Sequence, residues 1–183
     1  MVDLAGDMVI ETPRLRLRRP RAADVDAVHA YRSRPDVARH LGAGTWTREK
    51  TAAELALYAA SAFSRPDDEL VLLVELLATG VVVGEVGLVR REQGAEVGYV
   101  FHPDHGGRGL ATEAVSAVVT AALADGSPRI IARTDAANRS SRALCERLGF
   151  TLIATAVSED GRGVAECTYE RAASHHGGAD GTP

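Results

Sequence analysis

The clearest chemical signal in the sequence is a glycine-rich segment, His105-Gly106-Gly107-Arg108-Gly109-Leu110-Ala111-Thr112-Glu113-Ala114. It follows an apolar run typical of a strand and opens a run typical of a helix. Its three glycines let backbone N–H groups turn toward one point without side chains in the way. The N–H groups of a first helical turn lack internal partners, and the helix dipole makes that end attractive to anions. The segment therefore predicts a pyrophosphate site, to which Arg108 adds charge.

Two other nucleotide-binding loops do not fit this segment. A Walker loop ends in Gly-Lys-Ser/Thr, and the segment contains no lysine. The dinucleotide fingerprint requires a third glycine where Thr112 stands, and the strands expected before the segment do not form a βαβ unit. A glycine-rich turn that merely connects two elements remains the alternative.

Two glutamates are candidate general bases, because each interrupts an apolar run close to this segment. Glu96 shares one strand face with Gly98 and Val100, and Glu85 lies between two glycines in the preceding run. A carboxylate in a largely apolar strand must be near solvent, paired or in a site. Each glutamate is therefore a base, a water-positioning group or an ordinary paired residue, and a water chain without a dedicated base is a further alternative.

A second group of polar residues falls on a short helix near the C-terminus. Asn138 is a natural N-cap, and Ser141 and Cys145 follow at three and seven positions, on one stripe of the helix. Leu144 and Leu148 form another stripe that should face the core. The polar stripe is then free to face a cofactor, although Cys145 also fits the role of a small buried hydrophobic residue.

These groups are expected in the middle of a mixed α/β sheet. The pattern predicts strands over residues 14–19, 70–77, 81–90, 96–101, 129–134, 151–157 and 164–170, and helices over residues 21–32, 36–41, 47–63, 109–124 and 140–148. Short breaks containing glycine predict an antiparallel meander in the middle of the chain and a closing hairpin around Asp160-Gly161. A helical crossover between strands gives the sheet its mixed character.

Composition excludes several classes of function. The 21 Lys and Arg residues and 25 Asp and Glu residues leave a formal charge of −4, which gives no pull toward nucleic acid or an anionic membrane. No apolar run reaches the roughly 18 residues that a membrane helix needs. Cys145 and Cys167 make neither a disulfide scaffold nor a zinc site, so we expect a reduced cytoplasm and no metal. Residues 1–10 do not have the pattern of a signal peptide.

Taken together, these residues resemble the GNAT family of N-acetyltransferases. The acetyl-CoA loop of that family follows Gln/Arg-x-x-Gly-x-Gly/Ala; Gly109 and Ala111 match it, and Gly106 departs from its first position. Further matches are Thr12-Pro13-Arg14-Leu15-Arg16-Leu17-Arg18, Ala95-Glu96-Val97-Gly98-Tyr99-Val100 and the run from Asn138 through Leu148-Gly149-Phe150. The resemblance spans about residues 10 to 171 and is strongest to the Rim-type branch, which acetylates ribosomal-protein N-termini.

The resemblance implies a GNAT fold, with a mixed, mostly antiparallel central sheet and helices on both faces. We expect one domain over residues 10–172 and a disordered tail over residues 173–183, which contains His175 and His176. The implied co-substrate is acetyl-CoA. Its expected contacts are Val100, Phe101, His102, Gly106, Gly107, Arg108, Gly109, Leu110, Ala111, Thr112, Asn138 and Ser141. The contacts on the strand, at residues 99–102, should be made by the main chain, so that side-chain identity there carries little information.

The implied reaction is direct attack of a primary amine, on a protein N-terminus or a small molecule, on the thioester. In many relatives a tyrosine seven residues after the asparagine protonates the departing thiolate, but that position here is Cys145. Ser141, Cys145 or water then takes the role, or the thiolate leaves unaided; of the two side chains we expect Ser141. A non-catalytic acyl-CoA-binding module is the alternative function. The expected partners are acetyl-CoA and the amine acceptor, without nucleic acid or membrane, and a homodimer is compatible with the sequence.

Overall fold

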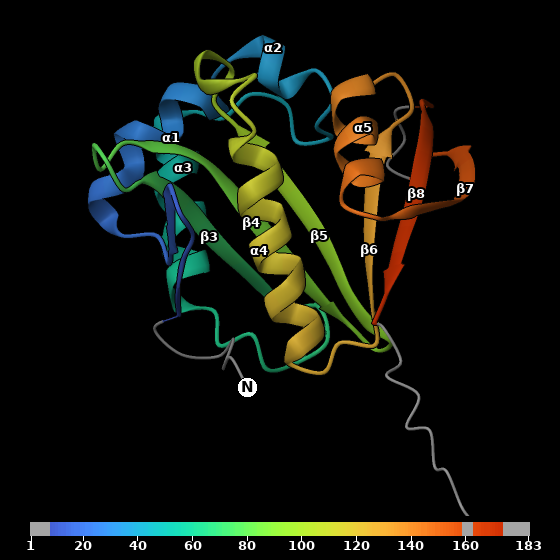
Figure 1. Cartoon of the computed structure of the whole chain (residues 1–183). Coiled ribbons are helices and arrows are strands. Elements are labelled where there is room, and N and C mark those ends of the chain that lie inside the picture. Colours follow the sequence, from blue (N-terminus) through green and yellow to red (C-terminus); the bar gives the residue numbers. More distant parts are fainter. Residues whose placement is uncertain (1–7, 159–162, 174–183) are drawn as a thin grey trace, which may run out of the picture.

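An eight-stranded mixed sheet organises the part of the chain that the computed structural model describes, residues 8–158 and 163–173. The strands are β1 (Val9–Glu11), β2 (Leu15–Arg18), β3 (Glu69–Leu76), β4 (Val82–Arg91), β5 (Gly94–Phe101), β6 (Arg129–Asp135), β7 (Thr151–Val157) and β8 (Ala165–Ala172). The α-helices are α1 (Val25–Arg32), α2 (Pro35–Ala38), α3 (Arg48–Ala60), α4 (Leu110–Ala124) and α5 (Arg139–Arg147), and η1 (Ala22–Asp24) and η2 (Pro103–His105) are 3-10 turns. The strand order is β1-β2-β3-β4-β5-β6-β8-β7 (Figure 1).

The sequence predicted most of these elements. The antiparallel meander of β3, β4 and β5 is confirmed, and Thr47 caps α3 by accepting a hydrogen bond from the Lys50 N–H at 3.2 Å. Strand β1 was not predicted. The helix predicted over residues 21–32 begins as the 3-10 turn η1, because the Asp24 carboxylate accepts the Arg21 N–H at 2.7 Å. The helix predicted over residues 36–41 is shorter, since the chain leaves α2 after Ala38. The predicted tail and the Asp160-Gly161 turn lie outside the described residues, apart from Ala173.

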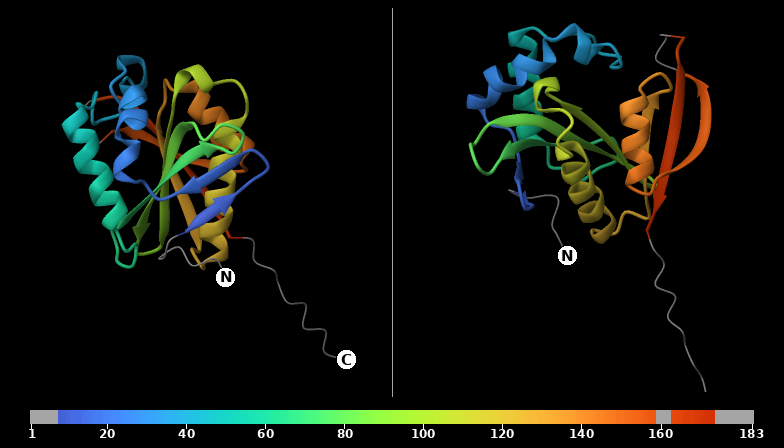
Figure 2. Two further views of the ribbon diagram at one scale, coloured as in Figure 1. Left: turned by 90° about the vertical axis from the view of Figure 1, so that its left-hand side faces the viewer. Right: turned by 45° about the horizontal axis from the view of Figure 1, so that its top comes forward.

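Helices cover both faces of the sheet, as predicted. Figure 2 shows α1 and α3 on one side of the sheet and α4 on the other. Alternation along β3 sends Leu72 toward the α4 side and Leu73 toward the α1 and α3 side, and both leucines are fully buried in separate apolar clusters. Leu144 and Leu148 of the α5 segment join the larger cluster, which confirms their predicted core position. No helix within the described residues is long and apolar enough to cross a membrane.

The sheet is interrupted between β5 and β6, which form its one parallel pair among the described strands. Their register runs from Ala95↔Ile130 to Val97↔Ala132 and ends there. Beyond this point the two strands diverge toward the upper end of Figure 1. On its other side, β6 pairs with β8 along its full length. The backbone of residues 98–101 therefore has no strand neighbour on the β6 side within the described chain.

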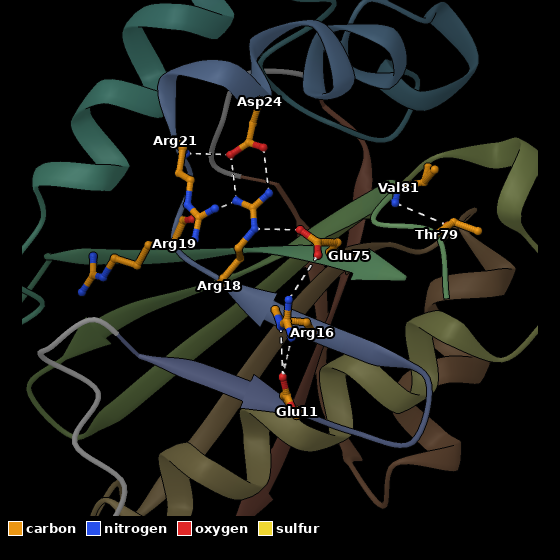
Figure 3. Close-up of polar contacts among 9 residues, drawn as sticks. All are labelled: Glu11, Arg16, Arg18, Arg19, Arg21, Asp24, Glu75, Thr79 and Val81. Atoms are coloured by element: carbon orange, nitrogen blue, oxygen red, sulfur yellow. Dashed lines mark hydrogen bonds and ion pairs between the residues drawn. The ribbon is translucent and has the colours of Figure 1, made fainter. Parts of the chain in front are cut away.

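A buried cluster of ion pairs ties β2 to β3 and to the start of α1 (Figure 3). The Arg18 side chain donates to both Asp24 carboxylate oxygens at 2.8 Å and to Glu75 at 2.8 Å. Arg18 and Asp24 are each only 7% exposed. Burial opposes ionisation of Asp24, but the hydrogen bonds from Arg18 and the Arg21 N–H, together with the two arginine charges, hold the pKa of the Asp24 carboxyl below its usual value.

Removing one partner of this cluster should destabilise the fold. We expect Asp24→Ala to lower the free energy of unfolding at pH 7 by about 3 kcal/mol, because it leaves a buried guanidinium with Glu75 alone. Because the pKa of Asp24 is lower in the folded state, its contribution is complete above the unfolded value of about 3.9 and disappears as the pH falls through the folded value. Urea denaturation at several pH values measures both effects. Asp26→Ala, which removes an exposed pair with Arg48 at 2.8 Å, is the control; equal losses in the two variants would contradict the prediction.

Candidate active site

The glycine-rich segment forms the predicted strand–loop–helix junction. Gly109 caps α4 with a left-handed backbone, φ 74°, which a glycine adopts without strain. No side chain caps this helix, so the first-turn N–H groups of Leu110, Ala111 and Thr112 are available to a ligand. Arg108 is exposed beside them. The junction therefore offers converging N–H donors, a helix dipole and one guanidinium to an anion.

A network from the first strands holds this loop in place. The Arg14 guanidinium donates to the Arg108 carbonyl oxygen at 2.9 Å and pairs with Glu113 at 2.6 Å. Thr12 Oγ1 also donates to Glu113, at 2.6 Å. Burial opposes ionisation of Glu113, but the bonds from Thr12 and Arg14 hold its pKa below the usual value. Glu113 thus fixes the loop to the sheet, which accounts for a carboxylate at this position without a catalytic role.

A cavity of about 650 Å³ lies between this loop, the free side of β5, the start of α5 and the segment after α2. It is lined by Asp36, Val37, Arg39, His40, Leu41, Tyr99, Val100, Phe101, Pro103, His105, Gly106, Gly107, Arg108, Gly109, Leu110, Ala111, Thr112, Asn138, Ser140, Ser141, Leu144 and Arg147. These include every residue predicted to contact acetyl-CoA except His102. His102 instead accepts the Asp104 N–H at 3.2 Å, and its ring meets Tyr31 edge-on.

Three polar side chains meet between β5 and α5. The Tyr99 hydroxyl lies 2.7 Å from Ser141 Oγ and 3.7 Å from Cys145 Sγ. Asn138 caps α5 by accepting the Ser141 N–H at 3.1 Å, which sets the direction of the helix. Burial raises the pKa of the Cys145 thiol and of the Tyr99 phenol, so both stay neutral near pH 7. Tyr99 and Ser141 line the cavity, whereas Cys145 is buried behind them.

A second cavity, of about 210 Å³, opens on the side of the sheet that α1 covers. It is lined by Arg32, Leu41, Glu69, Val71, Glu85, Gly87, Val89, Glu96, Gly98, Tyr99 and Val100. Gly87 and Gly98 face each other in register, and the lack of side chains there leaves room above the sheet. The two cavities share Leu41, Tyr99 and Val100, so they meet at the free side of β5.

Both predicted base candidates line this second cavity, and both are ion-paired. Glu85 is buried, accepts a hydrogen bond from the Tyr31 hydroxyl at 2.6 Å and forms an ion pair with Arg32. Glu96 pairs with Arg91 at 3.1 Å and with Arg133 at 3.0 Å. Register places Glu85 opposite Val100, where the cavities meet, whereas Glu96 precedes Val100 by four residues, about 13 Å of strand.

Among the lining residues that were not predicted as site residues, three carry polar groups that bear on the chemistry. The Tyr99 hydroxyl was missed because only main-chain contacts were expected from that strand. Glu69 lines the second cavity, and burial together with the nearby Glu85 carboxylate raises its pKa. His40 Nδ1 lies 2.9 Å from Asp135 Oδ2 at the first cavity. Alternation along β5 could have indicated that Tyr99 faces away from Glu96, but no local pattern joins it to Ser141, 42 residues later.

The pair of Arg32 and Glu85 should be important for stability, because both side chains are largely buried. The Arg32 guanidinium also stacks on Trp46, 4.2 Å from the ring centre. We expect Arg32→Ala to lower the free energy of unfolding by about 3 kcal/mol, since it leaves a buried carboxylate without its cation. The double variant Arg32→Met/Glu85→Gln should recover much of this loss in chemical denaturation, because no buried charge remains. Arg34→Ala, which breaks the more exposed pair with Asp36 on the same segment, is the control. A double variant with a lower free energy of unfolding than Arg32→Ala would contradict the argument.

Comparison with known proteins assigns the family. Residues 14–151 match the acetyltransferase (GNAT) domain model. An uncharacterised N-acetyltransferase of Bacillus subtilis, YoaA, is 31% identical over 148 residues, covering 78% of this chain and 82% of that protein.

Solved structures show the same fold. A GNAT-family acetyltransferase from Bacillus anthracis superposes with a TM-score of 0.80 at 25% identity, over 90% of this chain and 98% of that one. The Salmonella typhimurium enzyme that modifies the N-terminal serine of ribosomal protein L7/L12 has a TM-score of 0.76 at 17% identity, over 90% and 99% of the two chains. At this low identity the match shows the shared fold alone, so the Rim-type branch stays a prediction. The chain belongs to the GNAT family and is an acetyl-CoA-dependent N-acetyltransferase.

Proposed function

We propose that the enzyme transfers an acetyl group to a primary amine by direct attack of the amine nitrogen on the thioester. The observation that carries this proposal is the meeting of two cavities at Val100, on the free side of β5. One cavity leads to the glycine-rich loop and the other leads to a group of carboxylates. A donor and an acceptor that enter from these two sides would bring their reacting atoms together at this point, as a direct transfer between them requires.

The first cavity suits acetyl-CoA. We assign its pyrophosphate to the loop of residues 106–112, where N–H groups and Arg108 converge. Its pantetheine arm would pair with the main chain of residues 98–101, which has no strand neighbour on that side. A backbone N–H of the same strand would bind the oxyanion that forms on the thioester carbonyl.

The second cavity suits a cationic amine. Its lining includes Glu69, Glu85 and Glu96 against the single cation of Arg32. Glu85 is the carboxylate in register with Val100, so we assign it ahead of Glu96 as the group that orients the ammonium or a water that takes its proton. The hydrogen bond from Tyr31 and the ion pair with Arg32 fix the position of the Glu85 carboxylate, which suits this role.

For the leaving thiolate we assign Ser141 as the hydrogen-bond donor. Ser141 lines the donor cavity, whereas Cys145 does not and its buried thiol has a raised pKa. The acceptor is a protein N-terminus, as in the Rim-type branch, or a small amine. We place the enzyme in the cytoplasm, since Cys145 and Cys167 are both free thiols.

Release of free thiol from acetyl-CoA in the presence of amines tests the function directly. We expect turnover with at least one member of a panel of N-terminal peptides and small primary amines. Acetyl-CoA binding without thiol release from any panel member would favour the non-catalytic acyl-CoA module instead.

Gly109→Val should abolish most acetyl-CoA binding. It places a branched side chain at φ 74°, where the backbone meets the pyrophosphate. We expect calorimetry to show at least a ~10-fold loss of affinity, the equivalent of one charge-assisted hydrogen bond. Gly80→Val is the matched control, because Gly80 has φ 70° in a remote turn and carries the same strain. Unchanged affinity in folded Gly109→Val would refute the assignment of the loop.

The two glutamates can be separated by their pH–rate profiles. We expect Glu85→Gln to lower kcat by ~10²-fold at neutral pH, and Glu96→Gln to lower it much less. Raising the pH should restore much of the Glu85→Gln rate, because free amine becomes abundant. Wild-type pH–rate profiles in both folded variants would indicate that a water chain, and not a glutamate, takes the amine proton. A larger loss of kcat in Glu96→Gln than in Glu85→Gln would assign the role to Glu96.

A further inference from the structure

The Tyr99 hydroxyl is a polar group at the donor cavity to which the proposed reaction gives no role. It reaches α5 from β5 and lies between Ser141 and Cys145. The distance to Ser141 Oγ, 2.7 Å, is typical of a hydroxyl–hydroxyl hydrogen bond, whereas 3.7 Å to Cys145 Sγ allows only a weak contact.

The direction of the bond between the two hydroxyls follows from their surroundings. Burial, with the nearby Cys145 thiol, raises the pKa of Tyr99, so the phenol keeps its proton near pH 7. The Tyr99 hydroxyl can donate to either of two Ser141 oxygen atoms, and Oγ, at 2.7 Å, is closer than the carbonyl, at 3.3 Å. The phenol is the stronger acid of the two hydroxyls, which makes it the better donor. When it donates to Ser141 Oγ, the Ser141 proton is left to point into the cavity.

We propose that Tyr99 is a positioning residue, whose hydroxyl donates to Ser141 Oγ and thereby directs the Ser141 hydroxyl proton toward the sulfur of the departing CoA. This inference rests on the proposed function, because it assigns to Ser141 the hydrogen bond to the leaving thiolate. Hydroxyl groups in a chain polarise one another, so accepting the hydrogen bond from Tyr99 makes the Ser141 hydroxyl a better donor.

The proposed step requires no charge on Tyr99. When the tetrahedral intermediate collapses, its C–S bond breaks and the electron pair goes to sulfur, while the acyl carbon keeps its new bond to nitrogen. Ser141 donates a hydrogen bond to that sulfur, and the proton that the amine loses finally neutralises the thiolate through water. Tyr99 stays a neutral phenol throughout, as its raised pKa requires.

A double-mutant cycle on acetyl transfer tests the coupling. We expect Tyr99→Phe to lower kcat by about 3- to 10-fold, the effect of one neutral hydrogen bond, with the affinity for acetyl-CoA unchanged. In the Ser141→Ala background the same change should have no further effect, because Tyr99 acts through Ser141. A loss that persists undiminished in that background would overturn the proposal.

The matched control is Tyr169→Phe. Tyr169 is also buried, and its hydroxyl also bonds to α5, donating to Glu146 and accepting from Arg142 at 3.2 Å each, but it does not line the cavity. We expect it to leave kcat unchanged. An equal loss in Tyr169→Phe would show that Tyr99 only packs the helix, and would overturn the proposal.

A second readout does not depend on the amine. The pKa of the thiol of bound CoA can be followed by its ultraviolet thiolate absorbance, as the difference between titrations of the complex and of the free protein. A hydrogen bond from Ser141 favours the thiolate, so Tyr99→Phe should raise this pKa. An unchanged value would overturn the role of Tyr99. Failure of every amine in the turnover assay, with the thiol pKa still shifted, would refute the proposed acceptor chemistry alone.

Discussion

The free side of β5 is the constraint on which the rest of the structure depends. A buried backbone N–H or C=O without a partner costs free energy, and residues 98–101 lose their neighbouring strand where β6 diverges from β5. The glycine-rich loop, the start of α5 and the segment after α2 all border this edge. The interruption that weakens the sheet therefore also leaves donors and acceptors for a ligand, and the ligand's own amides can complete the strand's hydrogen bonding.

Arginine–carboxylate pairs hold helices and loops to the sheet. Arg18 joins β2 to Asp24 and Glu75, Arg14 joins the turn before β2 to Glu113 of α4, and Arg32 joins α1 to Glu85. Buried pairs of this kind add little net stability compared with apolar packing, but breaking one leaves a costly unpaired charge. The effect of these pairs is to fix the positions of the segments that they join. The forked guanidinium fits carboxylates in a fixed geometry, so the loop and the Glu85 carboxylate cannot shift independently of the sheet.

The two sides of β5 differ in chemistry because of strand alternation. Tyr99 points toward α5, where it meets the neutral Ser141 hydroxyl and Cys145 thiol. Glu96, Gly98 and Val100 face the second cavity, which the carboxylates line. A neutral donor suits a departing thiolate, and a carboxylate suits an arriving ammonium. In the proposed transfer, one strand thus separates the group that assists the thiolate from the carboxylates that meet the amine, and the glycines at positions 87 and 98 leave space beside those carboxylates.

The sequence by itself determined the elements and the form of the glycine-rich loop, because both depend on residues that are near one another in the chain. Apolar periods of two and 3.6 residues locate strands and helices, and the glycines around residue 107 fit a backbone anion site regardless of distant contacts. Only the tertiary structure decided which polar groups share a cavity. Glu85 meets Arg32 and Tyr31 across more than 50 residues, Tyr99 meets Ser141 across 42, and Cys145 turns behind that pair. These contacts arise from strand register and from the angle at which helices cross the sheet, and no local pattern of residue types encodes either one.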